Sequence, residues 1–224
     1  MAPETSIKFK PGDLFGGNSD AKLAVAFLLD CSGSMEGELI EQMNKGIQAF
    51  ADFIKSNQIA KHRLDITIIS FGDEVTVQQE NVSADDLEPP YLQAGGETPM
   101  GEAILTALDI LEQQKQYYKA EDIEYIKPII ICLTDGEPTD EEHFKEATDE
   151  LLMAEAKNKV SFYCIGCNEA NMSVMDNMHT KHAPMIMKGL DIKKFFKLIS
   201  VIVSGSVGTD GQVDMSEIKR QYAR

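Results

Sequence analysis

Short apolar runs alternate along this chain with segments in which apolar residues recur every three or four positions. The clearest run covers residues 23–29, and similar runs lie at 64–71, 129–133, 160–165 and 183–187. Continuous apolar runs of this length are typical of strands buried on both faces, and the intervening segments have the period of helices. The alternation predicts an α/β fold with a doubly wound, mainly parallel sheet and helices on both faces.

A sixth strand is predicted at the edge of this sheet. Gly72 and Asp73 end the second apolar run and turn the chain into residues 74–79. A tight hairpin makes its two strands antiparallel, so we expect a six-stranded sheet with one antiparallel edge strand. The following stretch, 81–96, contains adjacent prolines and adjacent glycines and is expected to be a loop.

Four helices are predicted. The first has one apolar stripe, with spacings of four, four, three and four residues, formed by Leu39, Met43, Ile47, Phe50 and Ile54. The second follows Thr98, with Pro99 at its first position, where a missing N–H is tolerated. The third begins near Glu141, and the last covers residues 192–203.

The predicted organisation is one domain with two flanking segments. Residues 1–21 include Pro11, Gly12, Gly16 and Gly17 and are expected to be an irregular lead-in. Residues 22–205 form the domain, and residues 206–224 are expected to be a C-terminal tail. A chain of 224 residues is long enough to bury a large core.

Hard oxygen ligands are predicted to meet at one edge of the sheet. Asp30, Ser32 and Ser34 follow the first apolar run directly, and Asp135 follows the run at 129–133. In a doubly wound sheet, ligands bind beyond the carboxyl ends of the strands, where the strand order reverses. If these two strands are neighbours across that reversal, the two carboxylates converge, and Thr98 at a helix start can reach the same point.

Carboxylates and hydroxyls suit Mg²⁺, Mn²⁺ or Ca²⁺ and require no thiolate or imidazole. We expect one divalent cation, with Mg²⁺ first and Mn²⁺ or Ca²⁺ as alternatives. If one aspartate acts only through water, the metal keeps residual positive charge and an open coordination position. That combination favours capture of an external carboxylate, such as an Asp or Glu side chain of a partner protein.

These five positions resemble the metal-ion-dependent adhesion site of the von Willebrand factor A (VWA) domain. The pattern of that family is Asp-x-Ser-x-Ser, a distant Thr, and a distant Asp that is usually followed by Gly. It is matched, in order, by Asp30, Ser32, Ser34, Thr98 and Asp135, with Gly136 after the last. The resemblance covers about residues 22–205 and implies a protein-binding module. In some members of the family, metal coordination is coupled to a displacement of the last helix, here 192–203.

Two segments, 95–103 and 133–140, also resemble the compact bacterial VWA proteins associated with tellurium resistance and stress response. That resemblance implies a cytosolic protein that works beside a kinase-like protein and a phosphatase. It leaves open whether such a partner phosphorylates this chain.

The side chains next to the ligands form a candidate rim for a partner. Met35 and Met100 each flank a proposed ligand, and Glu97 and Glu137 lie in the same loops. Exposed methionines would provide a soft apolar grip around the ion. The alternative, burial of both methionines beneath the loop, is equally compatible with the sequence.

Composition limits the classes of partner. The formal net charge of −16 argues against nonspecific binding of nucleic acid and against docking on an anionic membrane. The N-terminal residues do not resemble a signal peptide, and no apolar run is long enough to span a bilayer. Cys132 and Cys164 lie in apolar runs, as expected for reduced cysteines, so we expect a cytoplasmic location.

Two other functions are compatible with part of this pattern. A phosphohydrolase of the haloacid dehalogenase type also begins its chemistry from an Asp after a first strand. That family needs a second Asp two positions later, where this chain has Ser32, so we expect no enzyme activity. The other alternative is a scaffold that uses the same fold without metal. A redox role for Cys164 and Cys167 is disfavoured, because no helix is expected to start at Cys167.

Overall fold

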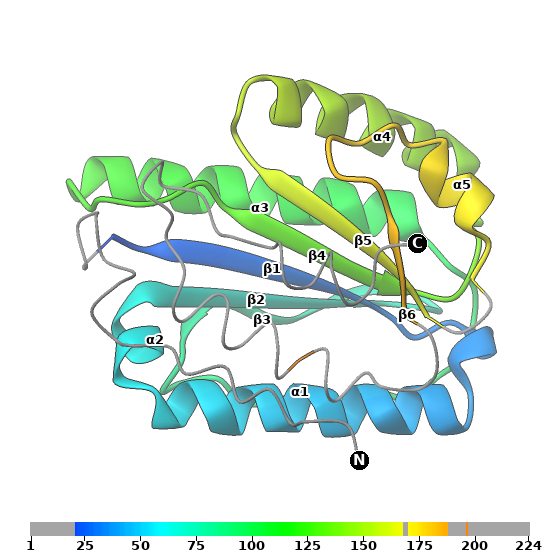
Figure 1. Cartoon of the computed structure of the whole chain (residues 1–224), viewed down its shortest axis with the longest axis horizontal. Coiled ribbons are helices and arrows are strands. Elements are labelled where there is room, and N and C mark those ends of the chain that lie inside the picture. Colours follow the sequence, from blue (N-terminus) through cyan, green and yellow to red (C-terminus); the bar gives the residue numbers. More distant parts are fainter. Residues whose placement is uncertain (1–20, 168–169, 188–195, 197–224) are drawn as a thin grey trace, which may run out of the picture.

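The computed structural model describes residues 21–167, 170–187 and Phe196. Its centre is a six-stranded sheet with strand order β3-β2-β1-β4-β5-β6 (Figure 1). The strands are β1 (Leu23–Asp30), β2 (Leu64–Phe71), β3 (Val75–Ser83), β4 (Ile129–Thr134), β5 (Ser161–Cys167) and β6 (Met185–Met187). Strand β3 runs antiparallel to β2, and the other four pairings are parallel. The predicted fold class is confirmed.

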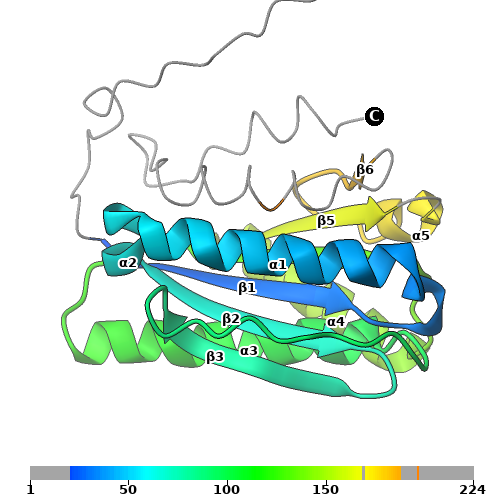
Figure 2. The same ribbon diagram turned by 90° about the horizontal axis from the view of Figure 1, so that it is seen from below.

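Helices cover both faces of the sheet. They are η1 (Gly33–Met35), α1 (Glu38–Ser56), α2 (Gln58–Arg63), α3 (Met100–Ala120), α4 (Glu141–Ala156) and α5 (Met172–Asp176). Helix α1 lies on one face, and α3 and α4 lie on the other (Figure 2). The two faces therefore carry separate apolar cores on either side of one sheet.

Strand β1 shows why the sheet is buried on both sides. Val25, Phe27 and Leu29 belong to the core beneath α1, whereas Ala26 and Leu28 belong to the core beneath α3 and α4. All these side chains are at most 1% exposed. A strand whose side chains alternate between two apolar layers must be apolar throughout. The continuous run at 23–29 is the sequence signature of that position.

Several elements and boundaries differ from those predicted. The turn η1 and the short helix α5 were not expected, β5 ends at Cys167 rather than 165, and β6 begins at Met185 rather than 183. Helix α2 was not expected; the Asn57 side chain caps it by accepting hydrogen bonds from the N–H groups of Ile59 (2.9 Å) and Ala60 (3.1 Å). Strand β3 extends to Ser83 rather than 79, because a register shift with Asn81 at φ 48° absorbs a bulge. Helix α3 begins at Met100, so Pro99 is its N-cap rather than its first residue.

The predicted last helix, 192–203, lies outside the described residues except for Phe196. Its ring packs in the α1 core against Phe27 and Phe50, with centroid separations of 5.6 and 6.1 Å. The predicted tail at 206–224 and the lead-in, apart from Ala21, also lie outside the described residues.

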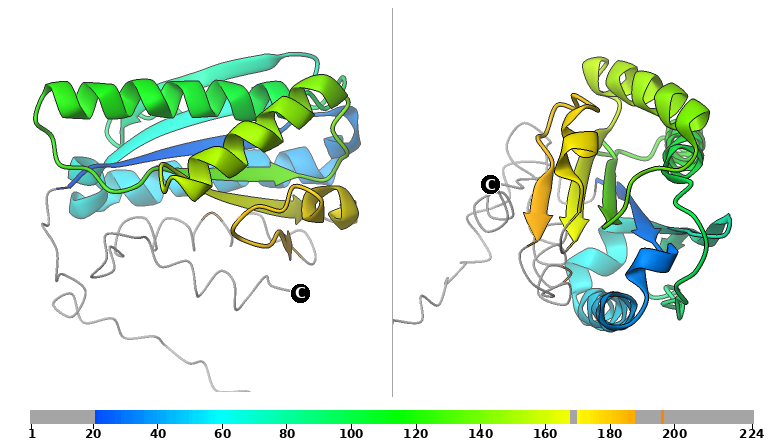
Figure 3. Two further views of the ribbon diagram at one scale, coloured as in Figure 1. Left: turned by 90° about the horizontal axis from the view of Figure 1, so that it is seen from above. Right: turned by 90° about the vertical axis from the view of Figure 1, so that its right-hand side faces the viewer.

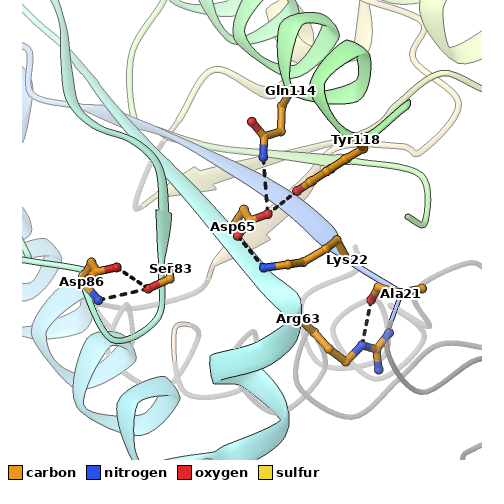
Figure 4. Close-up of polar contacts among 8 residues, drawn as sticks. All are labelled: Ala21, Lys22, Arg63, Asp65, Ser83, Asp86, Gln114 and Tyr118. Carbon is orange, nitrogen blue, oxygen red and sulfur yellow. Dashed lines mark hydrogen bonds and ion pairs between the residues drawn. The ribbon is translucent and has the colours of Figure 1, made fainter. Parts of the chain in front are cut away.

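A polar cluster closes the amino end of the sheet (Figure 4). The buried Asp65 carboxylate accepts hydrogen bonds from Lys22 Nζ (3.0 Å), Gln114 Nε2 (3.4 Å) and the Tyr118 hydroxyl. Lys22 is also an ion-pair partner, so the carboxylate is neutralised by the chain itself. The cluster joins the segment before β1, the start of β2 and the end of α3.

Candidate metal centre

The strand order reverses between β1 and β4, which are parallel neighbours. From the carboxyl ends of these two strands the chain crosses over in opposite directions, from β1 to β2 on one side and from β4 to β5 on the other. Asp30 is the last residue of β1, and Asp135 follows Thr134 at the end of β4. This edge faces the viewer in the right-hand panel of Figure 3. The two acids therefore meet at the switch point, where the sequence predicted them.

Asp30 is the innermost group of the site and is 0% exposed. Its Oδ1 accepts a hydrogen bond from the Ser32 N–H (2.8 Å), and its Oδ2 accepts one from the Thr134 hydroxyl. Burial raises the pKa of the Asp30 carboxyl, and the nearby Asp135 charge adds to this, against the lowering effect of the hydrogen bonds from Ser32 and Thr134. Neutral donors surround this carboxylate, but they bring it no compensating positive charge.

The hydroxyls of the first loop connect the two acids. Ser32 Oγ and Ser34 Oγ lie 3.0 Å apart, and the Ser34 hydroxyl donates to Asp135 Oδ1 at 2.7 Å. Ser32 is buried and Ser34 is exposed. The chain of hydroxyls therefore leads from the buried acid at the end of β1 to the half-buried acid after β4.

Thr98 completes the set from a third loop. A Cβ atom placed on Gly136 would lie 3.3 Å from Thr98 Oγ1 and 3.8 Å from Asp30 Oδ2. The Thr98 hydroxyl and the Asp30 carboxylate thus approach the same point beside Gly136, where a side chain would crowd them. Thr139, in the loop after β4, holds Thr98 in place through two hydrogen bonds of 3.0 Å. The Thr98 N–H donates to Thr139 Oγ1, and the Thr139 N–H donates to the Thr98 carbonyl.

Backbone hydrogen bonds hold the loops together. The Gly95 N–H donates to the Cys31 carbonyl at 2.8 Å, and the Gly33 N–H donates to the Gly96 carbonyl at 3.1 Å. Gly96 has φ 75°, and a Cβ there would lie 2.1 Å from Asp73 Oδ1. Only glycine satisfies both the left-handed backbone and this close approach. The paired glycines before Thr98 are therefore part of the site's construction.

The donor set fits a small divalent cation held by oxygen. Among residues 21–167 and 170–187, no group of three or more His, Cys, Asp or Glu side chains is arranged to hold a metal ion. The site instead combines two carboxylates with the hydroxyls of Ser32, Ser34 and Thr98. Within the described part of the chain, no Lys, Arg or His forms an ion pair with either acid. Oxygen ligands around two uncompensated carboxylates suit Mg²⁺, Mn²⁺ or Ca²⁺.

The expected methionine rim is wrong. Met35 is 0% exposed in the core beneath α1, and Met100 is 1% exposed in the core beneath α3. The turn of η1 and the first turn of α3 direct these apolar side chains inward, which removes more apolar surface from water than a rim would. The other rim candidates, Glu97 and Glu137, are exposed beside the site.

Three supporting residues were missed by the sequence analysis. Thr134 donates to Asp30, Thr139 holds Thr98, and Asp140 accepts hydrogen bonds from the N–H groups of Gly101 (3.1 Å) and Glu102 (2.8 Å). Asp140 thereby caps the start of α3 from the loop after β4. The position of Thr134 next to Asp135 was a local signal. The partners of Asp140 lie 38 and 39 residues away, and nothing in the sequence pairs them.

The four cysteines lie in buried surroundings that do not activate their thiols. Cys31, Cys132, Cys164 and Cys167 are all free and buried. Burial raises the pKa of the Cys31 thiol to about 12, with the Asp30 charge adding to the effect, and the thiol donates to the Leu29 carbonyl rather than joining the site. Cys164 and Cys167 both lie within β5, so no helix start activates Cys167.

The sequence matches the family model of the von Willebrand factor type A domain over residues 24–197, which is more than half of the chain. This chain belongs to that family. Curated relatives with similarity to this VWA domain include inter-alpha-trypsin inhibitor heavy chain H4 of Homo sapiens, 27% identical over 150 residues. Heavy chain H6 of Homo sapiens is 30% identical over 126 residues. These matches cover 63% and 51% of this chain but 15% and 9% of the relatives, so the chain spans a small part of their length.

Solved structures share the fold. The pilus adhesin SpaC of Lactobacillus rhamnosus GG aligns over 82% of this chain and 31% of its own, with a TM-score of 0.63 and 12% identity. The ArnB paralog VWA2 of Sulfolobus acidocaldarius aligns over 81% of this chain and 45% of its own, with a TM-score of 0.54 and 20% identity. The manganese-loaded TRAP protein of Plasmodium vivax aligns over 84% of this chain and 74% of its own, with a TM-score of 0.50 and 14% identity. At these identities the likeness concerns the fold.

VWA domains are protein-interaction modules that are often metal-dependent, and membership of the family gives this chain that coarse function. Among the described residues, no helix has the length and apolar character needed to cross a membrane.

Proposed function

We propose that this VWA domain binds a partner protein through a divalent cation, Mg²⁺ first, with Mn²⁺ or Ca²⁺ as alternatives. Asp30, Ser32, Ser34, Thr98 and Asp135 would hold the ion. The ion supplies a positive centre with an open position, to which an Asp or Glu side chain of the partner binds. The manganese-loaded TRAP protein supports a divalent cation in this fold.

One observation carries the proposal. Asp30 is fully buried with neutral donors only, and a line of hydroxyls connects it to a second acid. A buried carboxylate that no cation compensates opposes folding, so a protein retains one where a bound cation or a function offsets that cost. The hydroxyls and the second carboxylate near Asp30 carry no positive charge, but their oxygen atoms are suitable ligands for a divalent cation.

Metal binding is tested by isothermal calorimetry and thermal unfolding with Mg²⁺, Mn²⁺ and Ca²⁺ in turn. We expect a saturable heat and a rise in Tm for the wild type, and neither for Asp135→Ala. Glu141→Gln is the matched control, because it removes an exposed acid of a neighbouring segment and should leave both signals unchanged. Absence of binding by all three ions would support the metal-free scaffold instead.

The partner class is the finer part of the proposal. The resemblance of residues 95–103 and 133–140 to tellurium-resistance VWA proteins supports a cytoplasmic stress complex with kinase-like and phosphatase partners. Four free, buried cysteines accord with a reducing compartment. Capture of partners from the native cell, with and without chelator and with Asp135→Ala as bait, tests this. Recovery of the same proteins in all three samples would contradict metal-dependent binding.

We also propose that the chain is not an enzyme. Asp30 is the residue that a haloacid-dehalogenase reaction would use as nucleophile, but the position two residues later is Ser32. Hydrolysis of a generic phosphate ester with Mg²⁺ should therefore stay at the level of a protein-free control. Turnover that disappears in Asp30→Asn would overturn this proposal.

A further inference from the structure

A polar pocket of about 320 Å³ adjoins the candidate metal centre on the side of β2 and β3. Its wall includes Cys31 and Gly95, whose backbones are joined by the 2.8 Å hydrogen bond that holds the first metal loop. A Cβ on Gly72 would lie 2.8 Å from the carbonyl oxygens of both residues. The pocket and the metal centre therefore share one rigid wall of backbone.

The pocket carries negative charge that the chain does not neutralise. Asp73 and Glu74 line it, both are exposed, and within the described residues neither side chain has a hydrogen-bond or ion-pair partner. The Asp73 carboxylate packs against Gly96, two residues before Thr98, so it also contacts the loop that leads to Thr98. Two of the uncharged polar side chains of the wall, Ser70 and Gln78, are bonded to each other at 2.8 Å, and Thr76 and Gln93 also line it.

An aromatic residue, Tyr91, also lines this pocket. Tyr91 is 79% exposed, the highest value among the large apolar and aromatic side chains of the described residues. Its neighbour Leu92 is buried, and Asn44 of α1 bonds both the N–H (2.8 Å) and the carbonyl (2.9 Å) of Leu92. The loop is therefore clamped, and Tyr91 is held in solvent by a fixed backbone. An exposed ring that lines the same pocket as two carboxylates is a surface for a cation.

The loops around the candidate metal centre are also negatively charged. The sequence segments 31–38, 72–75, 93–103 and 135–142 contain acidic residues and no Lys, Arg or His. A partner that brings only a carboxylate to this edge meets repulsion around it. A partner that also brings a cationic side chain removes that repulsion and gains contact with Asp73, Glu74 and Tyr91.

We propose that this pocket binds an arginine or lysine side chain of the same partner protein whose carboxylate reaches the metal. The inference rests on the proposed function, because it names the second contact of that complex. The partner's recognition element is thus an acidic residue and a basic residue at a fixed separation.

The test uses labelled synthetic peptides and the full chain with saturating Mg²⁺. Each peptide has one Asp and one Arg separated by a glycine spacer, and the set covers spacers of increasing length. One matched set replaces Arg with citrulline, which keeps the shape and removes the charge. A second set replaces Asp with Asn. Fluorescence anisotropy gives the affinities at low and high salt.

For the wild type, we expect the best Arg peptide to bind about five- to tenfold more tightly than its citrulline counterpart, with the ratio falling at high salt. The double variant Asp73→Asn/Glu74→Gln should bring the ratio close to one, and Tyr91→Ala should reduce it. The control Glu146→Gln/Glu150→Gln removes the same number of charges from exposed positions on α4 and should leave the ratio unchanged.

The outcomes separate the two proposals. Equal Mg²⁺-dependent binding of the Arg and citrulline peptides, or no binding of any peptide, overturns the basic subsite. An equal fall of the ratio in the α4 control also overturns it, because the attraction would then be general. An Arg preference that persists without Mg²⁺ and with the Asn peptides supports the subsite and contradicts capture of the carboxylate by metal.

Discussion

Each end of the sheet contains a buried aspartate, and the two are treated in opposite ways. At the amino end, Asp65 is paired with Lys22 and bonded by Tyr118 and Gln114 (Figure 4). At the carboxyl end, Asp30 has neutral donors and a second acid, Asp135, close by. The first arrangement satisfies itself and stabilises the fold. The second leaves its charge uncompensated by the chain, which is the arrangement that the proposed cation site needs.

The largest expected effect is at the amino end. Asp65→Ala leaves the Lys22 ammonium and the Tyr118 hydroxyl without their partner, and we expect a loss of about 3 kcal/mol in the free energy of unfolding. For a domain of this size the corresponding fall in Tm is about 6–12 °C. Calorimetric unfolding measures it, with the exposed Asp86→Ala as control, where a change within about 0.5 kcal/mol is expected. The Mg²⁺ response should survive; its loss would mean that the two ends are not independent.

A smaller effect at the same end comes from Tyr118→Phe. This change removes the hydroxyl that donates to Asp65 and keeps the ring that stacks on Tyr125, with centroids 5.3 Å apart. A hydrogen bond to a charged group contributes about 2 kcal/mol, so denaturant unfolding should show a loss of that order. Tyr117→Phe is the control, because its side chain is 53% exposed. Equal losses in the two variants would contradict a special role for the Asp65 cluster.

The same isosteric change should have the opposite sign at the other end. Asp30→Asn removes a buried, uncompensated charge, so we expect the metal-free variant to have a higher Tm than the wild type. It should also lose the stabilisation by metal, about 1.4 kcal/mol at a concentration ten times the dissociation constant. Thermal unfolding with and without Mg²⁺ measures both. A metal-free Tm below that of the wild type would show that Asp30 is a structural acid like Asp65.

The smallest effect concerns pH. Because burial raises the pKa of Asp30 above its ordinary value of 3.8, the folded state binds this proton more tightly than the unfolded state. Without metal, ionised Asp30 therefore opposes folding fully above the raised pKa, and this opposition falls away as the pH drops from the raised pKa to below the ordinary value of 3.8. The stability difference between Asp30→Asn and wild type should shrink between these two values. A difference that grows on acidification would contradict the shift.

The fold, and the position of the five candidate ligands at one end of the sheet, could be predicted because each rests on a local signal. A strand buried on both faces must be apolar throughout, so Leu23–Leu29 identified a central strand, and Asp30 followed as the first polar residue at its end. Asp135 is marked in the same way at the end of β4. Strand ends and helix starts are local features, and parallel topology places them at one edge.

The surroundings of these positions were not predictable, because they depend on contacts between distant residues. Met35 is 0% exposed although it lies among polar residues in the sequence, since η1 turns its side chain into the core beneath α1. The cap that Asp140 gives α3 spans almost forty residues, and nothing local indicates it.

The sequence by itself determined which residues end the strands and which of them carry oxygen. The tertiary structure alone decided that Asp65 is neutralised within the chain while Asp30 is not. Packing also placed Asp73, Glu74 and Tyr91 around one pocket beside the loop that follows Asp30. The physical reason is that a charge becomes costly or useful according to its burial and its neighbours, and these are set by packing.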